Sequence, residues 1–199
     1  MTPYPNRASA LRATLAAAML LGLAACATPD TSTLNPGANA GQTMSLLPHR
    51  QEMAISQAAA KRAKGQRVWC VPFARDLSGI NLRGNAGTWW HAAEGIYARG
   101  KEPQVGAVMV FSAGRNLRVG HVAVVSEVVN AREIRVDHAN WERNRVTLRQ
   151  RVVDISEAND WSTVRVESVP GSLGKPYAVS GFVYNRPVTQ AARATARGV

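Results

Sequence analysis

"GHVAVVSEVV" (residues 120–129) and "EIRVDHANW" (residues 133–141) are two neighbouring segments rich in β-branched residues. Successive side chains of a strand point to opposite faces, so His121, Ala123 and Val125 share one face of the first segment. Its other face carries Val122 and Val124, and is equally apolar. This pattern predicts a central strand that is buried on both sides. If the second segment pairs with the first as a hairpin, its polar end lies beside the start of the first.

The segments around this hairpin predict the fold class. Further strands are expected at residues 106–111, 145–153 and 179–185, which are also rich in β-branched residues and bounded by Gly, Asn or Pro. Helices are expected earlier in the chain, at residues 50–64 and 70–79 and within residues 86–100, where the helix ends near Gly95 or Gly100. No helical pattern separates consecutive strands. The sequence therefore predicts an α+β fold in which short N-terminal helices pack on an antiparallel β-sheet.

The N-terminus has the pattern of an export signal. Arg7 and Arg12 precede an uninterrupted apolar run at residues 13–25, which is too short to span a bilayer comfortably. The run ends in "LAAC" (residues 23–26), which resembles a bacterial lipobox. This resemblance implies that residues 1–25 are a lipoprotein signal peptide and that Cys26 is lipidated. Ala27 follows, so no acidic residue retains the protein at the inner membrane, and anchoring at the periplasmic face of the outer membrane is implied.

The remaining chain divides by composition. We expect residues 26–64 to form a lipidated tether with a short helix, residues 65–187 to form the catalytic domain, and residues 188–199 to form a disordered basic tail. Lys and Arg outnumber Asp and Glu by 24 to 13, a net charge of +11, which favours anionic partners. Aromatic residues do not alternate with the basic ones, so no nucleic-acid partner is expected.

One cysteine lies inside the expected domain. If Cys26 carries acyl chains, Cys70 has no disulfide partner and remains a free thiol. Cys70 opens the expected helix at residues 70–79, where backbone N–H groups and the helix dipole favour the thiolate and lower the pKa of the thiol. His121 could accept its proton. His138 and Asn140 share a strand face, and either could hold one ring nitrogen of His121.

The order of these motifs is similar to the CHAP domain, the cysteine, histidine-dependent amidohydrolase/peptidase. A cysteine at a helix start is followed by "PQVG" (residues 103–106), by "GHVAVV" and by a polar pair before Trp141. The resemblance covers about residues 66–186. It implies a papain-like α+β fold and cleavage of an amide bond in peptidoglycan, either as an N-acetylmuramoyl-L-alanine amidase or as a peptidoglycan endopeptidase.

The resemblance also implies roles for individual residues. Cys70 matches the nucleophile and His121 matches the general base. Many family members have Glu at the position of His138, so this chain departs from the pattern there, whereas Asn140 matches an Asn of the family. Which of these two orients His121 stays open.

Other candidates and alternatives complete the sequence-based interpretation. Trp69 and Trp90 are expected to line the substrate cleft, and Trp141 to pack beneath the active-site strand. No cofactor and no metal are expected, although Cys70, His121 and His138 together could offer three zinc ligands. The alternative to an enzyme is a non-catalytic cell-wall-binding or scaffold lipoprotein with the same fold. Expected partners are peptidoglycan and, through Cys26, a membrane. Whether a protein activator exists stays open.

Overall fold

The computed structural model describes residues 46–188. Within these residues the helices precede every strand, as expected. The helices are α1 (Pro48–Ala63), α2 (Cys70–Ser78), the 3-10 helix η1 (Ala86–Thr88) and α3 (Trp89–Ala92). The strands are β1 (Tyr97–Gly100), β2 (Val108–Phe111), β3 (His121–Asn130), β4 (Glu133–Ala139), β5 (Val146–Asp154), β6 (Thr163–Val169) and β7 (Ser172–Pro187).

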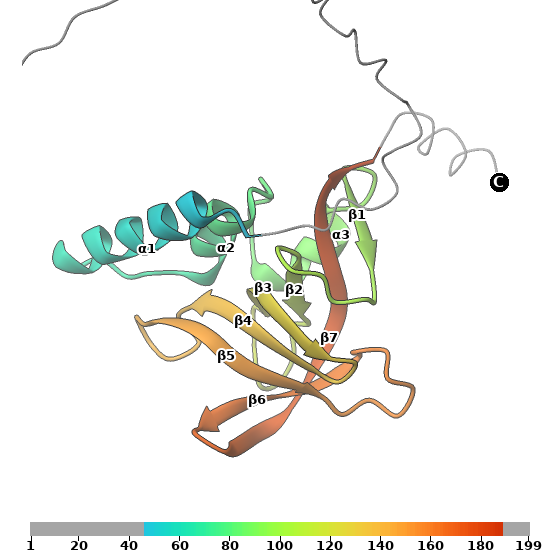
Figure 1. Cartoon of the computed structure of the whole chain (residues 1–199). Coiled ribbons are helices and arrows are strands. Elements are labelled where there is room, and N and C mark those ends of the chain that lie inside the picture. The colour runs from blue at the N-terminus through green and yellow to red at the C-terminus, as the bar shows by residue number, and fades with distance from the viewer. Residues whose placement is uncertain (1–45, 189–199) are drawn as a thin grey trace, which may run out of the picture. The chain divides into compact units, whose positions relative to one another are not determined.

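The strands form one antiparallel sheet that closes on itself. Their order is β1-β7-β2-β3-β4-β5-β6, and β6 also pairs with β7. The long strand β7 makes this closure, because its first part pairs with β6 and its later part pairs with β2 and β1. Figure 1 shows β7 running the length of the sheet. The α+β class and the antiparallel pairing are confirmed, while a papain-like arrangement stays a prediction.

Strands β2 and β3 lie between two hydrophobic clusters, as the two apolar faces of residues 120–129 predicted for β3. Val108 and Val122 belong to the cluster that packs under the helices. Met109 and Ala123, one residue further along each strand, belong to the cluster enclosed by the curved sheet. All four are fully buried. His121 begins β3 on the same face as Ala123, so its side chain enters at the edge of the enclosed cluster.

Helix α2 is held by its apolar face. Phe73 and Leu77, four residues apart, are buried in the cluster under the helices, and burial of each contributes about 2 kcal/mol. Gly79 ends the helix in the left-handed conformation, with φ 76°. Ala54 and Ala58 of α1 join the same cluster, and Figure 1 shows α1 and α2 side by side. The helix expected within the tether therefore packs on the domain.

The segment at residues 86–100 has a turn at Gly95, one of the two ends that the sequence predicted for its helix, but it holds two short helices and a strand in place of one helix. It forms η1 and α3, turns at Gly95 with φ 66°, and then pairs with β7 as β1. The left-handed conformation at Gly95 stops the helix, and the free edge of β7 takes the following residues as a strand. Strand β6 and the first part of β7 are strands that the sequence pattern did not indicate.

Several expectations fall on residues that the structure does not describe. The signal peptide at residues 1–25, Cys26, most of the tether and the tail from residue 189 lie outside the described residues. Among residues 46–188, no helix has the length and apolar character needed to cross a membrane.

Candidate active site

Cys70 is the first residue of α2, so its thiol lies at the N-terminal end of that helix. Trp69 precedes the helix in an extended conformation and supplies no side-chain cap. Pro72 has no N–H to offer. The N–H groups of Cys70 and Val71 therefore have no side-chain cap, and together with the N–H of Val122 on β3 they favour the thiolate form of Cys70.

Cys70 packs against the cluster that contains Val122, near the first residues of β3. The registered pairs between these strands run from Asn130 and Glu133 to Val124 and Asp137. The first residues of β3 lie beyond the last pair, and α2 packs against both strands. Since Val122 follows His121 directly, the thiol contacts the backbone next to the histidine that begins β3.

A chain of hydrogen bonds leads away from His121 across the sheet. Its Nε2 lies 3.0 Å from Nδ1 of His138 on β4. The other ring nitrogen of His138, Nε2, lies 2.6 Å from Oε1 of Gln150 on β5. The Nε2 of Gln150 then donates to the carbonyl oxygen of Glu167 on β6 at 2.6 Å. The expectation that His138 or Asn140 lies within hydrogen-bond reach of His121 is confirmed through His138.

Asn140 has a different set of partners. Its φ is 62°, and its Oδ1 accepts from the backbone N–H of Asn144 at 2.8 Å and from Nε of Arg67 at 3.4 Å. Oδ1 of Asn144 in turn accepts from the N–H of Val68 at 2.9 Å. These bonds tie the β4–β5 turn to the segment that leads into Cys70. Asn140 thus fixes the segment that leads to Cys70, whereas the hydrogen-bond partner of His121 is His138.

Aromatic rings enclose the two histidines. Trp141 meets the ring of His121 edge-on at 5.0 Å and stacks on the ring of His138 at 5.6 Å, with an interplanar angle of 21°. Phe111 meets His121 edge-on at 5.7 Å, and Tyr177 packs against Trp141 at 4.9 Å. Trp141 therefore packs against the active-site strands, as the sequence predicted, and the rings exclude water from both imidazoles.

Burial sets the protonation states at the site. It lowers the pKa of His121 well below 6.5, with a further contribution from His138. It also lowers the pKa of His138 to about 4, against the opposing effect of the bond to Gln150. Burial raises the pKa of the Cys70 thiol above 9.0, and the N–H groups of Val122, Val71 and Cys70 offset this only in part. The expectation of a lowered thiol pKa is therefore wrong, because desolvation outweighs the helix start.

This protonation state has a measurable consequence for alkylation. At pH 7 we expect iodoacetamide to label Cys70 several times more slowly than the same cysteine in the unfolded chain, because only the thiolate reacts and the fold disfavours it. The rate should continue to rise above pH 9. The measurement uses mass spectrometry on a Cys26→Ala chain, so that one thiol reacts. A labelling rate that is already constant below pH 7 would contradict the expectation and indicate a thiolate–imidazolium pair.

The two tryptophans expected in a cleft lie in different surroundings. Trp69 is 50% exposed beside Cys70, and the guanidinium of Arg67 lies 4.1 Å above its ring. Trp90 is half-buried on α3 and packs so closely against β7 that a Cβ on Gly181 would lie 2.5 Å from its ring. The guanidinium of Arg99 covers it at 4.7 Å. Contact with substrate stays a prediction for both.

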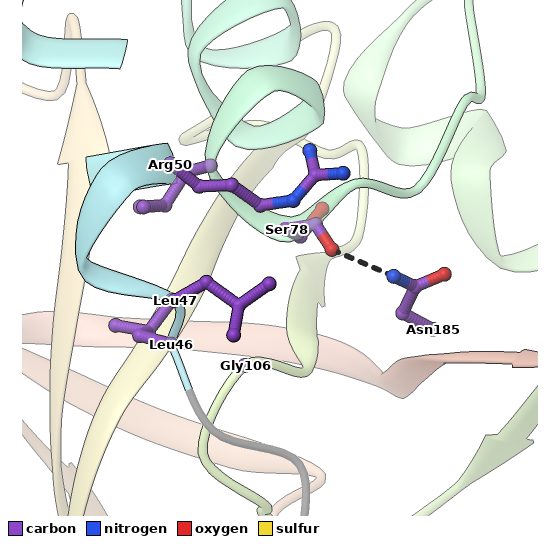
Figure 2. A pocket seen from close by; sticks show the side chains of 7 residues that line it. Leu46, Leu47, Arg50, Ser78, Gly106 and Asn185 are labelled. Carbon is purple, nitrogen blue, oxygen red and sulfur yellow. Dashed lines mark hydrogen bonds between the residues drawn. The ribbon is translucent and has the colours of Figure 1, made fainter. Parts of the chain in front are cut away.

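A hollow at the opposite end of α2 is separate from this site. Figure 2 shows its lining side chains, among them Arg50 and Asn185. Nη1 of Arg50 donates to the carbonyl of Asp76 at 3.3 Å, and Nδ2 of Asn185 donates to that of Ser78 at 3.1 Å. Both side chains thus satisfy carbonyl groups at the C-terminal end of the helix. The polar side chains of the hollow therefore stabilise the C-terminal end of α2.

The zinc alternative finds no support in residues 46–188. There, no three His, Cys, Asp or Glu side chains are grouped so that they could hold a metal ion. In addition, both ring nitrogens of His138 already take part in hydrogen bonds with His121 and Gln150.

Gln150 is the member of the site that sequence reasoning missed. It follows His138 by 12 residues, in the segment "RVTLRQRVV" (residues 145–153), where polar residues look like the solvent side of a strand. No signal in the sequence distinguishes it from its polar neighbours. Its position depends on the pairing of β4 with β5, which only the folded sheet defines.

The fold and the site define a class of domain. It is an α+β domain in which a thiol at a helix start packs against a strand whose first residue, His121, is hydrogen-bonded to a second buried histidine on the neighbouring strand. Residues 61–140 match the family model of the CHAP domain. The match includes Cys70, His121 and His138, whereas Gln150 lies beyond it. A search of the curated proteins finds no match. The CHAP domain indicates a hydrolase of the amidase or peptidase type with peptidoglycan as its substrate.

Proposed function

We propose that the protein cleaves an amide bond of peptidoglycan by a Cys–His mechanism, with Cys70 as the nucleophile and His121 as the general base. The observation that carries the proposal is the placement of the thiol against the backbone that follows His121, while His138 holds the far nitrogen of that ring. A base must be held in orientation by a third group, and His138 occupies that position.

Because burial disfavours the charged forms of both the Cys70 thiol and the His121 ring, the thiol loses its proton during the attack and not before it. As the Cys70 sulfur bonds to the amide carbon, the ring nitrogen of His121 that does not face His138 takes the thiol proton. The carbonyl electrons move to oxygen, and the N–H groups of Cys70 and Val71 are suited to donate hydrogen bonds to that oxyanion. His121 then protonates the leaving amine as the C–N bond breaks. Water, deprotonated by the same ring, hydrolyses the thioester and restores the thiol.

Digestion of purified sacculi tests the proposal and identifies the bond. An amidase frees the amine of the first residue of the stem peptide and leaves muramic acid unsubstituted. An endopeptidase creates a new amine and a new carboxylate within the peptides. Mass spectrometry of the released fragments distinguishes these products. Folded protein that binds sacculi and releases nothing would contradict the proposal and favour the non-catalytic wall-binding module.

We further propose that Cys26 is lipidated and anchors the chain at the periplasmic face of the outer membrane. We expect Cys26→Ala to move the protein from the membrane fraction to the soluble fraction, because two or more acyl chains bind a bilayer far more strongly than a single chain, whose binding is marginal. Immunoblots of fractionated cells measure the change. Cys70→Ala is the matched control and should stay with the membrane. A Cys26→Ala chain that still sediments with membranes would overturn the lipidation proposal.

A further inference from the structure

The hydrogen-bond chain behind His121 runs over four consecutive strands of the sheet. It joins His121 on β3, His138 on β4, Gln150 on β5 and the backbone carbonyl of Glu167 on β6. His121 is 4% exposed and His138 is 1% exposed, so water does not compete for these bonds. A buried chain of this kind has few consistent arrangements of its protons.

The backbone carbonyl of Glu167, at the end of this series of hydrogen bonds, determines the orientation of the Gln150 amide. A backbone carbonyl can only accept a hydrogen bond, so the amide group of Gln150 must turn its NH₂ toward Glu167. The rotated amide would place two oxygens 2.6 Å apart. Oε1 of Gln150 therefore faces His138, at 2.6 Å from Nε2, and can only accept. The proton between them belongs to Nε2 of His138.

The remaining protons follow in order. A neutral imidazole carries one N–H, so His138 with its proton on Nε2 has a bare Nδ1 that accepts. The Nε2 of His121, 3.0 Å away, must then carry a proton and donate it to this bond. A neutral His121 is left with a bare Nδ1. This nitrogen is the one that does not face His138.

We propose that Gln150 is a positioning residue that sets the tautomers of both histidines, so that Nδ1 of His121 is free to accept the thiol proton. The proposal rests on the assignment of His121 as the general base. In many CHAP domains a carboxylate occupies the position of His138, as the resemblance implies, and its charge alone would hold the N–H of the base. Here a neutral imidazole does so, and it needs its own proton fixed at the far nitrogen.

The low pKa of His138, about 4, keeps this ring neutral at physiological pH. A neutral ring can adopt either tautomer. Without a partner at Nε2, His138 could carry its proton on Nδ1 and donate it to Nε2 of His121. His121 would then carry its own proton on Nδ1, and its bare nitrogen, Nε2, would face His138 and not the thiol. The oxygen of Gln150 excludes this second arrangement.

Nitrogen NMR of the full chain with 15N-labelled histidine tests the proposal. Protonated and bare ring nitrogens have well-separated 15N shifts, and the exposed His49 and His91 serve as internal references. For both buried rings we expect a protonated Nε2 and a bare Nδ1 between pH 6 and 8. A protonated Nδ1 on either ring would overturn the proposal. Because this spectrum requires no substrate, it stays informative even if the protein proves not to hydrolyse sacculi.

Variants of Gln150 separate positioning from mere packing. Gln150→Leu removes the acceptor, and we expect mixed tautomers and a fall in kcat of about tenfold or more, with KM little changed. Gln150→Glu keeps an acceptor at Nε2, so it should keep the tautomers and move the acid limb of the kcat profile to higher pH. Gln104 is a half-buried glutamine that takes no part in this series of hydrogen bonds. Gln104→Leu is therefore the matched control and should leave the tautomers and kcat unchanged.

Two outcomes would overturn the proposal at this stage. One is a Gln150→Leu protein that keeps the wild-type tautomers and kcat. The other is a Gln150→Glu protein with the tautomers reversed. If Gln150→Leu does not fold, the wild-type spectrum and the Gln150→Glu variant decide the question.

Discussion

Cys70→Ser and His121→Ala should each release fragments from sacculi at least about a hundredfold more slowly than the wild-type protein. The expectation follows from the proposed mechanism, since loss of the nucleophile or the base removes the covalent route and leaves only binding and oxyanion stabilisation. The double variant should be only slightly slower than either single one, because residues that act as a unit are not additive. Release of soluble muropeptides with time, measured by chromatography, gives the rates.

His91→Ala is the matched control for the histidine substitution. His91 is exposed on α3, so its removal should leave the rate within about twofold of wild type. Circular dichroism establishes that each variant is folded. A folded Cys70→Ser protein with wild-type activity would contradict the assignment of the nucleophile. Single variants whose effects multiply in the double variant would contradict the idea that thiol and imidazole act together.

The centre of the fold and the histidine pair could be predicted from the sequence because local patterns encode them. Alternation in "GHVAVV" indicates a strand buried on both faces, and the hairpin brings the polar end of "VDHANW" beside His121. Pro72 and Gly79 mark the start and end of α2 in the same local way. These features depend on residues that are neighbours in the chain or in one hairpin.

Closure of the sheet could not be predicted in this way. The first part of β7 contains Gly174 and Pro176, residue types that are depleted in strands. These residues become a strand because β6 offers a partner for them, with Arg165 opposite Pro176. Such a pairing overrides local propensity, and only the three-dimensional arrangement shows it.

The electrostatics of the site were equally hidden. A helix start at Cys70 argues for a lowered thiol pKa, but the depth of burial decides the sign, and burial depends on how α1, α2 and β3 pack. The choice between His138 and Asn140 also depended on structure. The left-handed conformation of Asn140 turns its side chain toward the β4–β5 turn, which a strand pattern does not reveal.

Mild acid should destabilise the folded protein through the two buried histidines. His138 titrates at about 4 in the folded chain and near 6.5 when unfolded, and His121 is shifted in the same direction. Between these values the unfolded chain binds more protons than the folded one, so the free energy of unfolding falls as the pH falls. The shift of His138 alone corresponds to a loss of about 2 kcal/mol between pH 7.5 and pH 5.

Urea titrations of the full chain at pH 7.5, 6 and 5 measure this loss. This pH range lies above most of the titration of unfolded Asp and Glu, so the histidines dominate the pH dependence of the free energy of unfolding. His138→Gln removes one of the two groups and should make the pH dependence correspondingly weaker, whatever its effect on stability at pH 7.5. His91→Gln, at an exposed position, should leave the pH dependence as it is in wild type. A free energy of unfolding that is constant between pH 7.5 and 5 would mean that the two imidazoles take up protons in the folded protein as they do in the unfolded chain, and so are open to water. Open imidazoles would contradict the buried site in which the proposed attack by Cys70 takes place.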